Sequence, residues 1–518
     1  MTTVKLASEH GLAVTQASDI KESTIELTAD VVVIGSGAGG AVIAYEMAAA
    51  GKNVIILEAG PYVPSTGFTE KLPDMLELLY EDQGAQMNST GDMAILQGRC
   101  VGGSTVVNGA VTFRTPDVIL EKWNTQYGLT ELTKEALGPY FKKVEKNLSV
   151  HENQSHEIAK HSQILNRGAK ALGYSHKPLK RNTKNCGLTG HCLSGCASDR
   201  KQSSLITYLP WAISHGAKLF ADTRAMTIDH RDGKATGVTA ETRDPATGEK
   251  IADVIVHAST VVSSAGAIQS PLLFLRSKLG NSSGQVGKNF ACHPSTLMMA
   301  EFDEEIHSWR GAALGSYVDE FEHPDKGGFI LEGGGSGPVE IALGGEPGTG
   351  KEYVSFMSKA KNICSMVTLF HDRNVGHIYY DGDKKVIDYD ISEGDFPTLK
   401  RVIQEAAKVF LAAGAKRVLL PTVKKTEVRS LEELDQQIDL LENAPHTFRM
   451  VSYHPQGTMR MGPDKKKSVV DAYGQSHDVQ GLYVADASVF PTSVIVNPQI
   501  TVYALSSYIA DKILGKAL

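Results

Sequence analysis

The chain runs Val31-Val32-Val33-Ile34-Gly35-Ser36-Gly37-Ala38-Gly39-Gly40 close to its N-terminus. A short β-branched apolar run is typical of a buried parallel strand, and the alanine-rich residues 40–50 predict a helix that Gly51 ends. A second buried strand is expected at residues 53–57, with Glu58 at its end. This order predicts a strand–helix–strand unit of about 30 residues, the setting in which a glycine-rich turn binds a dinucleotide.

Each small residue of the glycine-rich turn has a predicted role. Gly35 permits the tight turn, Gly37 and Ala38 lie where the backbone approaches a pyrophosphate, and Gly40 lets the helix pack against the strand. Glu58 follows Gly35 by 23 residues and is placed to accept hydrogen bonds from an adenosine ribose. This pattern alone does not distinguish FAD from NAD.

Composition sets the broad class of the protein. With 518 residues, of which 42% are hydrophobic, the chain is expected to bury a large core in two or more domains. A net charge of -7 disfavours a nucleic-acid partner. No transmembrane segment and no secretory signal are expected. Six cysteines are too few for a disulfide scaffold, which favours a cytoplasmic location, with peripheral membrane contact compatible with the sequence.

Further elements are expected along the middle of the chain. They are a helix opening at Thr115-Pro116-Asp117, helical stretches 132–137 and 140–144 separated at Gly138-Pro139, a strand over 252–262 followed by an apolar helix, antiparallel strands at 367–370, 377–380 and 386–389, and a helix over 399–410. Residues 1–27 are expected to form a surface arm, and residues 173–196 a loop. The glycine-rich segment 327–350 is interpreted as a flexible connection or, alternatively, as a mobile lid over a pocket.

Two motifs near the C-terminus indicate the chemistry. One is Tyr453-His454-Pro455-Gln456-Gly457-Thr458, and the other, starting 43 residues after His454, is Asn497-Pro498-Gln499-Ile500-Thr501. A neutral imidazole is well suited to take the proton of an alcohol whose carbon loses a hydride. A carboxamide can hydrogen-bond to the same oxygen and stabilise the charge that grows there. His293, in Cys292-His293-Pro294, is interpreted as a structural histidine at a domain junction.

Several longer motifs carry a resemblance to a known family. Residues 102–108, within the small-residue segment Gly98–Gly109, resemble the first signature of the glucose–methanol–choline (GMC) oxidoreductase family, and residues 264–273 are similar to its second. Residues 286–290 and 484–491 and the two C-terminal motifs also match the family pattern. This resemblance extends from about residue 30 to the C-terminal region and says little about the substrate.

The resemblance implies an α/β fold with two domains. A Rossmann-like FAD/NAD(P)-binding domain would comprise residues 28–115, 205–295 and 452–518. A connecting region with a cysteine loop would span 116–204, and an α+β substrate domain with an antiparallel sheet would span 296–451.

The resemblance also implies FAD as the cofactor and gives roles to individual residues. Gly35, Gly37, Gly40 and Glu58 would hold the ADP half, and the backbone of Ala225 would contact adenine. The residues expected along the flavin are Gly103, Asn108, Gly109, Ala110, Asp486, Ala487 and Gln499. Some family members attach FAD through a histidine just before the asparagine; Val107 stands there, which predicts non-covalent FAD.

Cys186, Cys192 and Cys196 form a cysteine loop with spacing x5 and x3. It resembles a loop in the long-chain (fatty) alcohol oxidase branch of the family and, more loosely, the cluster-binding loop of iron–sulfur sugar dehydrogenases. Reduced thiols are the favoured state, and a disulfide, an iron–sulfur cluster or zinc are alternatives. We assign no metal ligand from the sequence.

The expected activity is FAD-dependent oxidation of an alcohol, with a long-chain or bulky apolar primary alcohol favoured, to an aldehyde or ketone. His454 would take the proton, Asn497 would orient the oxygen, and hydride would pass to flavin N5, with oxygen or another acceptor taking the electrons. The main alternative is a sugar or polyol dehydrogenase that passes electrons to a partner through an iron–sulfur cluster at the three cysteines. An NAD-dependent dehydrogenase and a non-redox flavin lyase are further alternatives.

Overall fold

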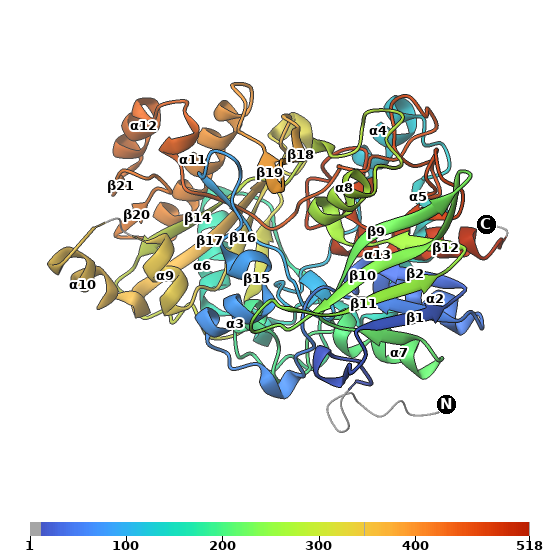
Figure 1. The fold of residues 1–518 in the computed structure, drawn as a ribbon. Coiled ribbons are helices and arrows are strands. Elements are labelled where there is room, and N and C mark those ends of the chain that lie inside the picture. The colour runs from blue at the N-terminus through green and yellow to red at the C-terminus, as the bar shows by residue number, and fades with distance from the viewer. Residues whose placement is uncertain (1–11, 346–347, 517–518) are drawn as a thin grey trace.

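The computed structural model describes residues 12–345 and 348–516. The chain forms two regions that lie side by side (Figure 1). One contains β2, β12, α2 and α13 and is called the parallel-sheet region; the other contains β14 to β17 and α11 and is called the antiparallel-sheet region. The predicted α/β fold, with a Rossmann-like part and an α+β part, is confirmed.

The parallel-sheet region is built on five parallel strands from distant parts of the sequence. Their order is β23 (Leu482–Val484), β12 (Thr260–Ser263), β2 (Val31–Ile34), β3 (Val54–Leu57) and β8 (Lys218–Phe220). Every residue of β2 and β3 is buried, as their β-branched sequences require, and α2 (Ala38–Ala49) connects them. The predicted strand–helix–strand unit is therefore confirmed.

A second sheet of four strands adjoins the first. Its order is β1 (Thr24–Thr28), β11 (Lys250–His257), β10 (Lys234–Arg243) and β9 (Thr223–Arg231). The prediction of one strand over 252–262 is wrong, because the strand is interrupted at Ala258-Ser259: β11 before it belongs to the four-stranded sheet, and β12 after it belongs to the parallel sheet. The expected surface arm is also wrong in part, since β1 pairs with β11; residues 1–11 lie outside the described part.

The antiparallel-sheet region is built on a longer sheet. Its strands in order are β21 (Glu427–Val428), β20 (Arg417–Leu419), β14 (Ser295–Glu301), β17 (Ile363–Phe370), β16 (Phe329–Gly334), β15 (Leu314–Val318) and β6 (His176–Pro178), and β22 (Met450–Ser452) joins β14 to β4 (Met93–Ile95). The amphipathic helix α11 (Phe396–Ala412) and α6 (Lys160–Leu172) pack on this sheet. Strands β4 and β6 come from outside the predicted substrate domain 296–451, so the two regions share chain segments.

A separate three-stranded sheet contains the predicted hairpin. It consists of β13 (Lys288–Phe290), β18 (Gly376–Asp381) and β19 (Lys384–Asp388). The turn at Asp381-Gly382 joins β18 and β19 in antiparallel register, as predicted. The expected strand at 367–370 belongs instead to β17 in the large sheet.

Two further expectations are wrong. Helix α5 (Lys134–Asn147) continues through Gly138-Pro139 although Pro139 lies inside the helix, because buried Leu137, Phe141 and Val144 hold the helix against the core. The glycine-rich segment is largely regular: it forms β16 and α9 (Pro338–Gly344), and α10 (Lys351–Met357) follows it. A side chain at Gly333 would approach Ser162 Oγ within 2.9 Å, so close packing explains this glycine.

Other elements complete the description. They are α3 (Leu72–Leu79), α4 (Asp117–Tyr127), α7 (Tyr208–Ser214), α8 (Gly266–Ser277), α12 (Leu431–Leu440), α13 (Gln499–Ile513), β5 (Val150–Glu152) and β7 (Lys180–Asn182). The two short strands β6 and β7 interrupt the expected loop 173–196.

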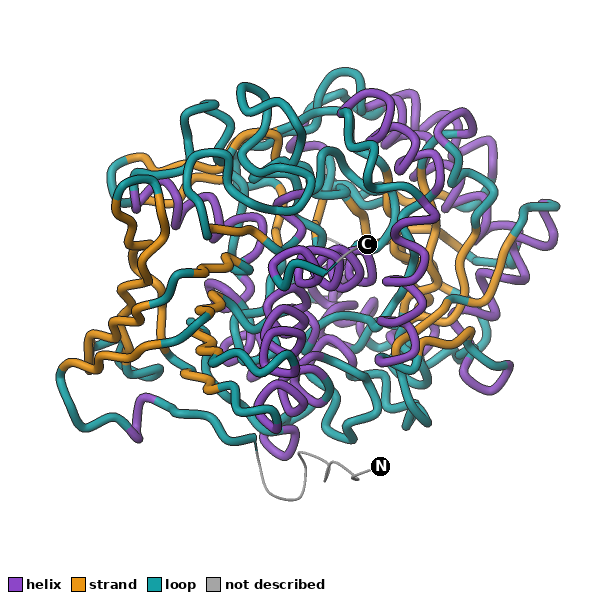
Figure 2. The backbone as a smooth tube through the Cα atoms, turned by 90° about the vertical axis from the view of Figure 1, so that its right-hand side faces the viewer, coloured by secondary structure: helices purple, strands orange, loops and turns teal. Residues whose placement is uncertain are grey.

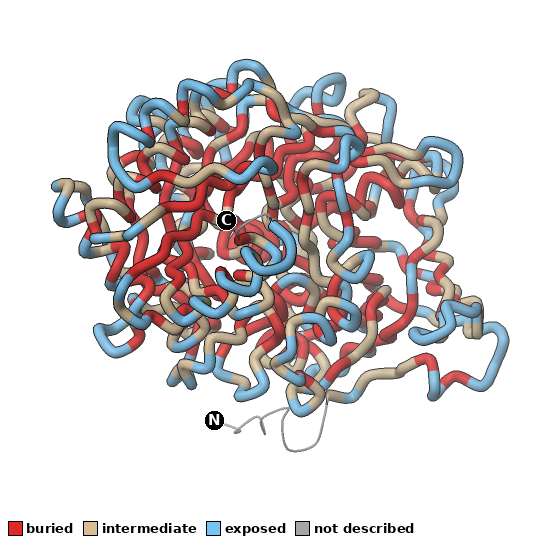
Figure 3. Tube along the Cα trace, turned by 90° about the vertical axis from the view of Figure 1, so that its left-hand side faces the viewer, coloured by how far each residue is buried: buried red, intermediate tan, exposed pale blue. Residues whose placement is uncertain are grey.

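Helix α13 lies at the centre of the parallel-sheet region, where it packs against α2 and α5. Helices occupy the middle of the view in Figure 2, with strands on both sides. Residues 500–510 are all buried, and Figure 3 shows buried segments in the interior with exposed turns around the outside. Within the described residues, none of the helices has the length and hydrophobicity that a membrane crossing requires.

Candidate active site

A cavity of about 350 Å³ is lined by residues of both regions. Thirteen of the fifteen site residues predicted from the sequence line it: Gly35, Gly37, Ala38, Glu58, Gly103, Asn108, Gly109, Ala225, His454, Asp486, Ala487, Asn497 and Gln499. Gly40 and Ala110 are not among the lining residues. The structure thus brings residues from both ends of the chain to one cavity.

The glycine-rich turn presents the start of α2 to this cavity. Ala41 N donates the first intrahelical hydrogen bond, to Gly37 O, so the N–H groups before it are available to an anion. The first turn of α2 has no acidic side chain that would repel a phosphate. A side chain at Gly40 would overlap the carbonyl of Gly35, so Gly40 acts through packing, as predicted.

Glu58 organises the turn from the end of β3. One carboxylate oxygen accepts hydrogen bonds from Ser36 N at 2.9 Å and Ser36 Oγ at 2.6 Å, and the other accepts one from Gly60 N at 2.9 Å. Burial raises the pKa of Glu58, which these donors partly offset. Because Oε1 can accept a further hydrogen bond, Glu58 can bind a ribose hydroxyl while it stays hydrogen-bonded to the glycine-rich turn.

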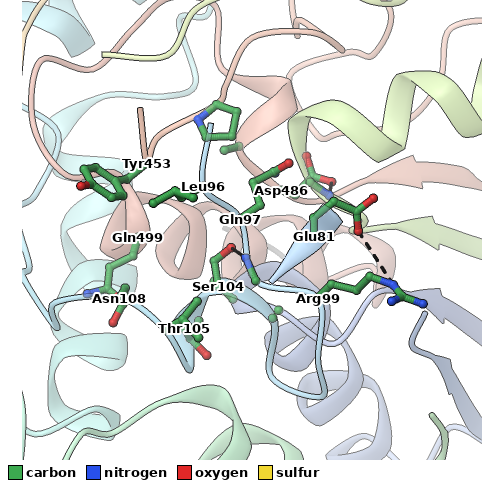
Figure 4. Close-up of a pocket in the computed structure, with 18 of the residues that line it drawn as sticks. Glu81, Leu96, Gln97, Arg99, Ser104, Thr105, Asn108, Tyr453, Asp486 and Gln499 are labelled. Carbon is green, nitrogen blue, oxygen red and sulfur yellow. Dashed lines mark hydrogen bonds and ion pairs between the residues drawn. The ribbon is translucent and has the colours of Figure 1, made fainter. Parts of the chain in front are cut away.

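The segment 98–111 forms the opposite wall. Asn108 Nδ2 donates to Gln499 Oε1 at 2.9 Å, and Gln499 Nε2 donates to Val111 O at 2.6 Å. Asn108 and Gln499 lie together in Figure 4. Asn108 Oδ1 accepts from the backbone N–H of buried Ala110, which explains the role of Ala110 behind the wall. A side chain at Gly103 would approach Gly37 Cα within 2.9 Å, so the two backbones pass too close together for a side chain at this position of the cavity wall.

Asp486 joins the end of β23 to the start of α8. Its carboxylate accepts from Gly266 N at 2.8 Å, Ser270 Oγ at 2.7 Å and Ser488 N at 2.8 Å. Ala225 lies on β9, and its carbonyl accepts from Arg276 Nη2 at 2.8 Å. Both residues therefore support the cavity wall through local hydrogen bonds. The adenine and flavin contacts expected of them stay predictions.

The two candidate catalytic residues approach the cavity from different elements. His454 follows β22 by two residues, and its backbone N–H donates to Ser452 Oγ at 3.3 Å. Asn497 lies two residues before α13. Burial lowers the pKa of His454 to about 3, so its imidazole is neutral at pH 7. A neutral imidazole and a carboxamide therefore line the same cavity as the glycine-rich turn.

Two residues that contact His454 were not predicted as site residues. His293 Nδ1 lies 3.3 Å from His454 Nδ1, and Gln456 Nε2 lies 3.3 Å from His293 Nε2. His293 is fully buried, as expected of a junction residue, but it contacts the candidate base directly. The available signal was the Cys-His-Pro sequence after the motif at 286–290.

Glu332 is a third unpredicted residue of the cavity. It lies on β16, inside the glycine-rich segment, and is 1% exposed. Burial raises its pKa to about 8, and a hydrogen bond with the Asn497 side chain opposes this rise. Leu96, Leu314, Val367 and Leu369 also line the cavity. Glu332 is thus a buried carboxyl group among largely apolar neighbours.

Comparison with known proteins decides the family. The family model described as GMC oxidoreductase matches residues 76–295 and, for its C-terminal part, residues 372–506. The FAD binding domain model matches residues 30–111. The chain belongs to the GMC oxidoreductase family. It is an FAD-dependent oxidoreductase, so the predicted family and the prediction of FAD are confirmed, while non-covalent attachment stays a prediction.

This GMC oxidoreductase has relatives along almost its whole length. It is 34% identical to a GMC-type oxidoreductase of Mycobacterium tuberculosis, over 95% of this chain and 76% of the relative. It is 28% identical to a long-chain-alcohol oxidase of Arabidopsis thaliana, over 96% of this chain and 69% of the relative. Pyridoxine 4-oxidase from Mesorbium loti has the same fold, with a TM-score of 0.71, 18% identity and coverage of 94% of this chain and 100% of that one.

The cysteine loop of this GMC oxidoreductase surrounds two buried cations. Arg181 donates to Cys192 Sγ at 3.3 Å and to Cys186 Sγ at 3.7 Å. Lys201 Nζ donates to the carbonyl oxygens of Val106 at 2.6 Å, Asn108 at 2.8 Å and Cys192 at 2.6 Å. The Lys201 hydrogen bonds therefore connect the cysteine loop to the cavity wall formed by residues 98–111.

The six cysteines all lie in the described part of the chain and are all free thiols. Among the described residues, no three His, Cys, Asp or Glu side chains are close enough to hold a metal ion. Reduced thiols stay the predicted state of the cysteine loop.

Proposed function

We propose that this GMC oxidoreductase oxidises a long-chain or bulky apolar primary alcohol to the aldehyde. The observation that carries the proposal is the neutral imidazole of His454, which lines the same cavity as Asn497 and the glycine-rich turn. Hydride removal from an alcohol requires loss of the hydroxyl proton, and a neutral imidazole can accept it.

The residues of the chain would divide the work as follows. The start of α2 and Glu58 would hold the ADP part of FAD, and the wall 98–111 with Gln499 would lie along its ring system. When bound, FAD supplies the hydride acceptor. His454 takes the hydroxyl proton, and the Asn497 amide hydrogen-bonds to the alcohol oxygen and stabilises its negative charge. The apolar side chains of the cavity exclude water from this oxygen.

Two observations favour an apolar substrate. Leu96, Leu314, Val367 and Leu369 lie in the cavity wall and can contact an alkyl chain. The similarity to long-chain-alcohol oxidases covers 96% of this chain. Oxygen is the proposed acceptor, in keeping with the names of these relatives, and non-covalent FAD is proposed because Val107 cannot form the bond that a histidine forms. The cytoplasmic location is retained as part of the proposal.

The test compares flavin reduction in wild type and His454→Ala. Both proteins, purified with FAD, are mixed without oxygen with dodecanol, and flavin absorbance is followed. We expect the variant to keep its FAD and to lose most of the reduction rate, while His323→Ala, a change at an exposed histidine, leaves the rate unchanged. Near-normal bleaching of His454→Ala would remove His454 from the mechanism.

Two controls separate the alternatives. Acid precipitation should release the yellow colour, whereas colour retained on the denatured chain would mean covalent FAD. Turnover with oxygen is compared with turnover with a dye acceptor, because an electron-transferring dehydrogenase would prefer the dye. Absence of bleaching by any alcohol, with FAD bound, would favour the non-redox alternative.

A further inference from the structure

Three side chains form a hydrogen-bonded row that ends at the candidate base. Gln456 Nε2 lies 3.3 Å from His293 Nε2, and His293 Nδ1 lies 3.3 Å from His454 Nδ1. Gln456 and His293 are both completely buried, so water does not compete for these contacts. The remaining ring nitrogen of His454, Nε2, is the one available to the cavity that this residue lines.

The orientation of the Gln456 amide is fixed by a backbone group. Its Nε2 also donates to His454 O at 3.1 Å, a contact that an amide oxygen could not make. The same nitrogen must therefore donate to His293, so His293 Nε2 is an acceptor and carries no proton. This assignment follows from the hydrogen-bonding partners alone.

The ring protons then follow one after another. Burial lowers the pKa of both His293 and His454 below 6.5, so each imidazole carries a single proton at pH 7. Since His293 has no proton on Nε2, it carries one on Nδ1 and donates it to His454 Nδ1. His454 must then carry its own proton on Nε2.

This tautomer opposes the role given to His454. With a proton already on Nε2, the imidazole faces the cavity as a hydrogen-bond donor and has no lone pair for the proton of an alcohol. A base-competent His454 requires its proton on Nδ1, donated to an unprotonated His293 Nδ1. His293 would then carry its proton on Nε2 and need an acceptor there.

Gln456 itself carries an acceptor that could reach His293. Gln456 Oε1 is buried and has no hydrogen-bond partner, which is a costly state for a carbonyl oxygen. A half turn of the amide would bring Oε1 to His293 Nε2, at the cost of the bond to His454 O. The observed orientation leaves Gln456 Oε1 unsatisfied, whereas the turned amide leaves both its Nε2 and His454 O without this hydrogen bond, so the turned orientation is the minor one.

We propose that Gln456, acting through His293, sets which ring nitrogen of His454 carries the proton, and that catalysis requires the Gln456 side-chain amide to rotate by half a turn. Gln456 and His293 are thus positioning residues. No proton is gained or lost in the switch, because each imidazole moves its single proton from one nitrogen to the other. The kinetic consequence rests on the proposed function of His454 as the base.

The direct test reads the tautomers in the FAD-bound protein. Nitrogen NMR of ¹⁵N-histidine-labelled protein is recorded without alcohol, with signals assigned by His293→Phe and His454→Ala. In wild type we expect the proton on Nε2 of His454 and on Nδ1 of His293. In Gln456→Glu, whose carboxylate accepts from His293 Nε2, both assignments should reverse. Gln456→Leu lacks the amide donor and should show both tautomers.

A kinetic arm connects the tautomer to catalysis. If the competent form is about one tenth of the wild-type population, Gln456→Glu should raise the anaerobic rate of flavin reduction by dodecanol about tenfold. The dodecanol dissociation constant should stay unchanged, which distinguishes a positioning role from altered substrate binding.

The outcomes are separable. A wild-type His454 protonated on Nδ1, or wild-type-like tautomers in both Gln456 variants, would overturn the proposal. If Gln456→Glu fails to fold, the Gln456→Leu spectrum decides. The NMR spectra are recorded without alcohol, so they test the tautomers whatever the substrate is. If dodecanol is not a substrate, or if His454 is not the base, only the proposed function is refuted.

Discussion

Replacing Glu332 by glutamine should stabilise the protein, and increasingly so as the pH rises. Glu332 is 1% exposed, and burial raises the pKa of its carboxyl group from 4.5 to about 8. Glutamine has nearly the same shape and can still hydrogen-bond to Asn497, but it has no proton to lose. The comparison therefore isolates the ionisation of this one group.

The sign follows from proton binding in the two states. The folded-state pKa lies above the unfolded value, so the contribution of Glu332 to wild-type stability is fully present below pH 4.5 and is lost as the pH rises to about 8. At ~1.4 kcal/mol per pH unit, this interval corresponds to a loss of ~5 kcal/mol, an upper limit because a buried site relaxes. The glutamine variant lacks this loss.

The assay is urea unfolding of both proteins with FAD between pH 5 and pH 9. The difference in unfolding free energy should grow in favour of Glu332→Gln up to about pH 8 and then level off. Glu432→Gln, at an exposed position of α12, controls for the general effect of removing a carboxylate. Equal pH dependence of wild type and Glu332→Gln would show that the carboxyl group is not held protonated and would refute the reasoning.

Three further predictions concern other sites. Burial holds the pKa of five described histidines below 6.5: His161 and His371, each at about 4, His454 at about 3, and His293 and His377. The melting temperature should therefore fall as the pH drops from 6.5 towards 4, and an unchanged melting temperature would contradict this. Gly138→Ala, inside α5 where an added methyl group meets nothing within 4 Å, should stabilise by about 0.5–1 kcal/mol in urea unfolding, and destabilisation would mean that α5 does not continue there. Iodoacetamide should label Cys196 first, because it is partly exposed and its pKa is lowered: burial raises this pKa, but hydrogen bonds with Lys201 and Ser198 and the nearby positive charge outweigh that rise. Buried Cys100 and Cys364 should stay unlabelled in the native protein by mass spectrometry, and faster labelling of either would contradict this.

Local patterns in the sequence were sufficient for the strand–helix–strand unit. The apolar run at 31–34, the glycines and Glu58 lie within 30 residues, and the buried strands require those residue types. The positions of His454 and Asn497 beside one cavity also followed from motifs. Each of these predictions depends on residues whose role is set by their immediate neighbours.

The missed features depend on tertiary contacts. Helix α5 runs through Gly138-Pro139 because its buried face outweighs a weak local propensity. Glu332 lies among glycines that suggest a flexible connection, yet they allow β16 to pack closely against Ser162. His293 meets His454 across 161 residues of sequence, and no local pattern carries such a contact.

The order of strands in the parallel sheet has a consequence for synthesis of the protein. β2 emerges from the ribosome early, but its partner β12 follows more than two hundred residues later, and β23 and α13 only near residue 500. Until then, the face of α2 that packs on α13 and the edge of β12 that pairs with β23 have no partner, and the contacts between α2 and α13 span most of the chain. Such long-range pairing is slow and leaves intermediates prone to aggregation. A nascent chain stopped before residue 482 would lack the edge strand β23 and the helix α13 that packs on α2, and we expect it to be insoluble rather than a smaller working enzyme.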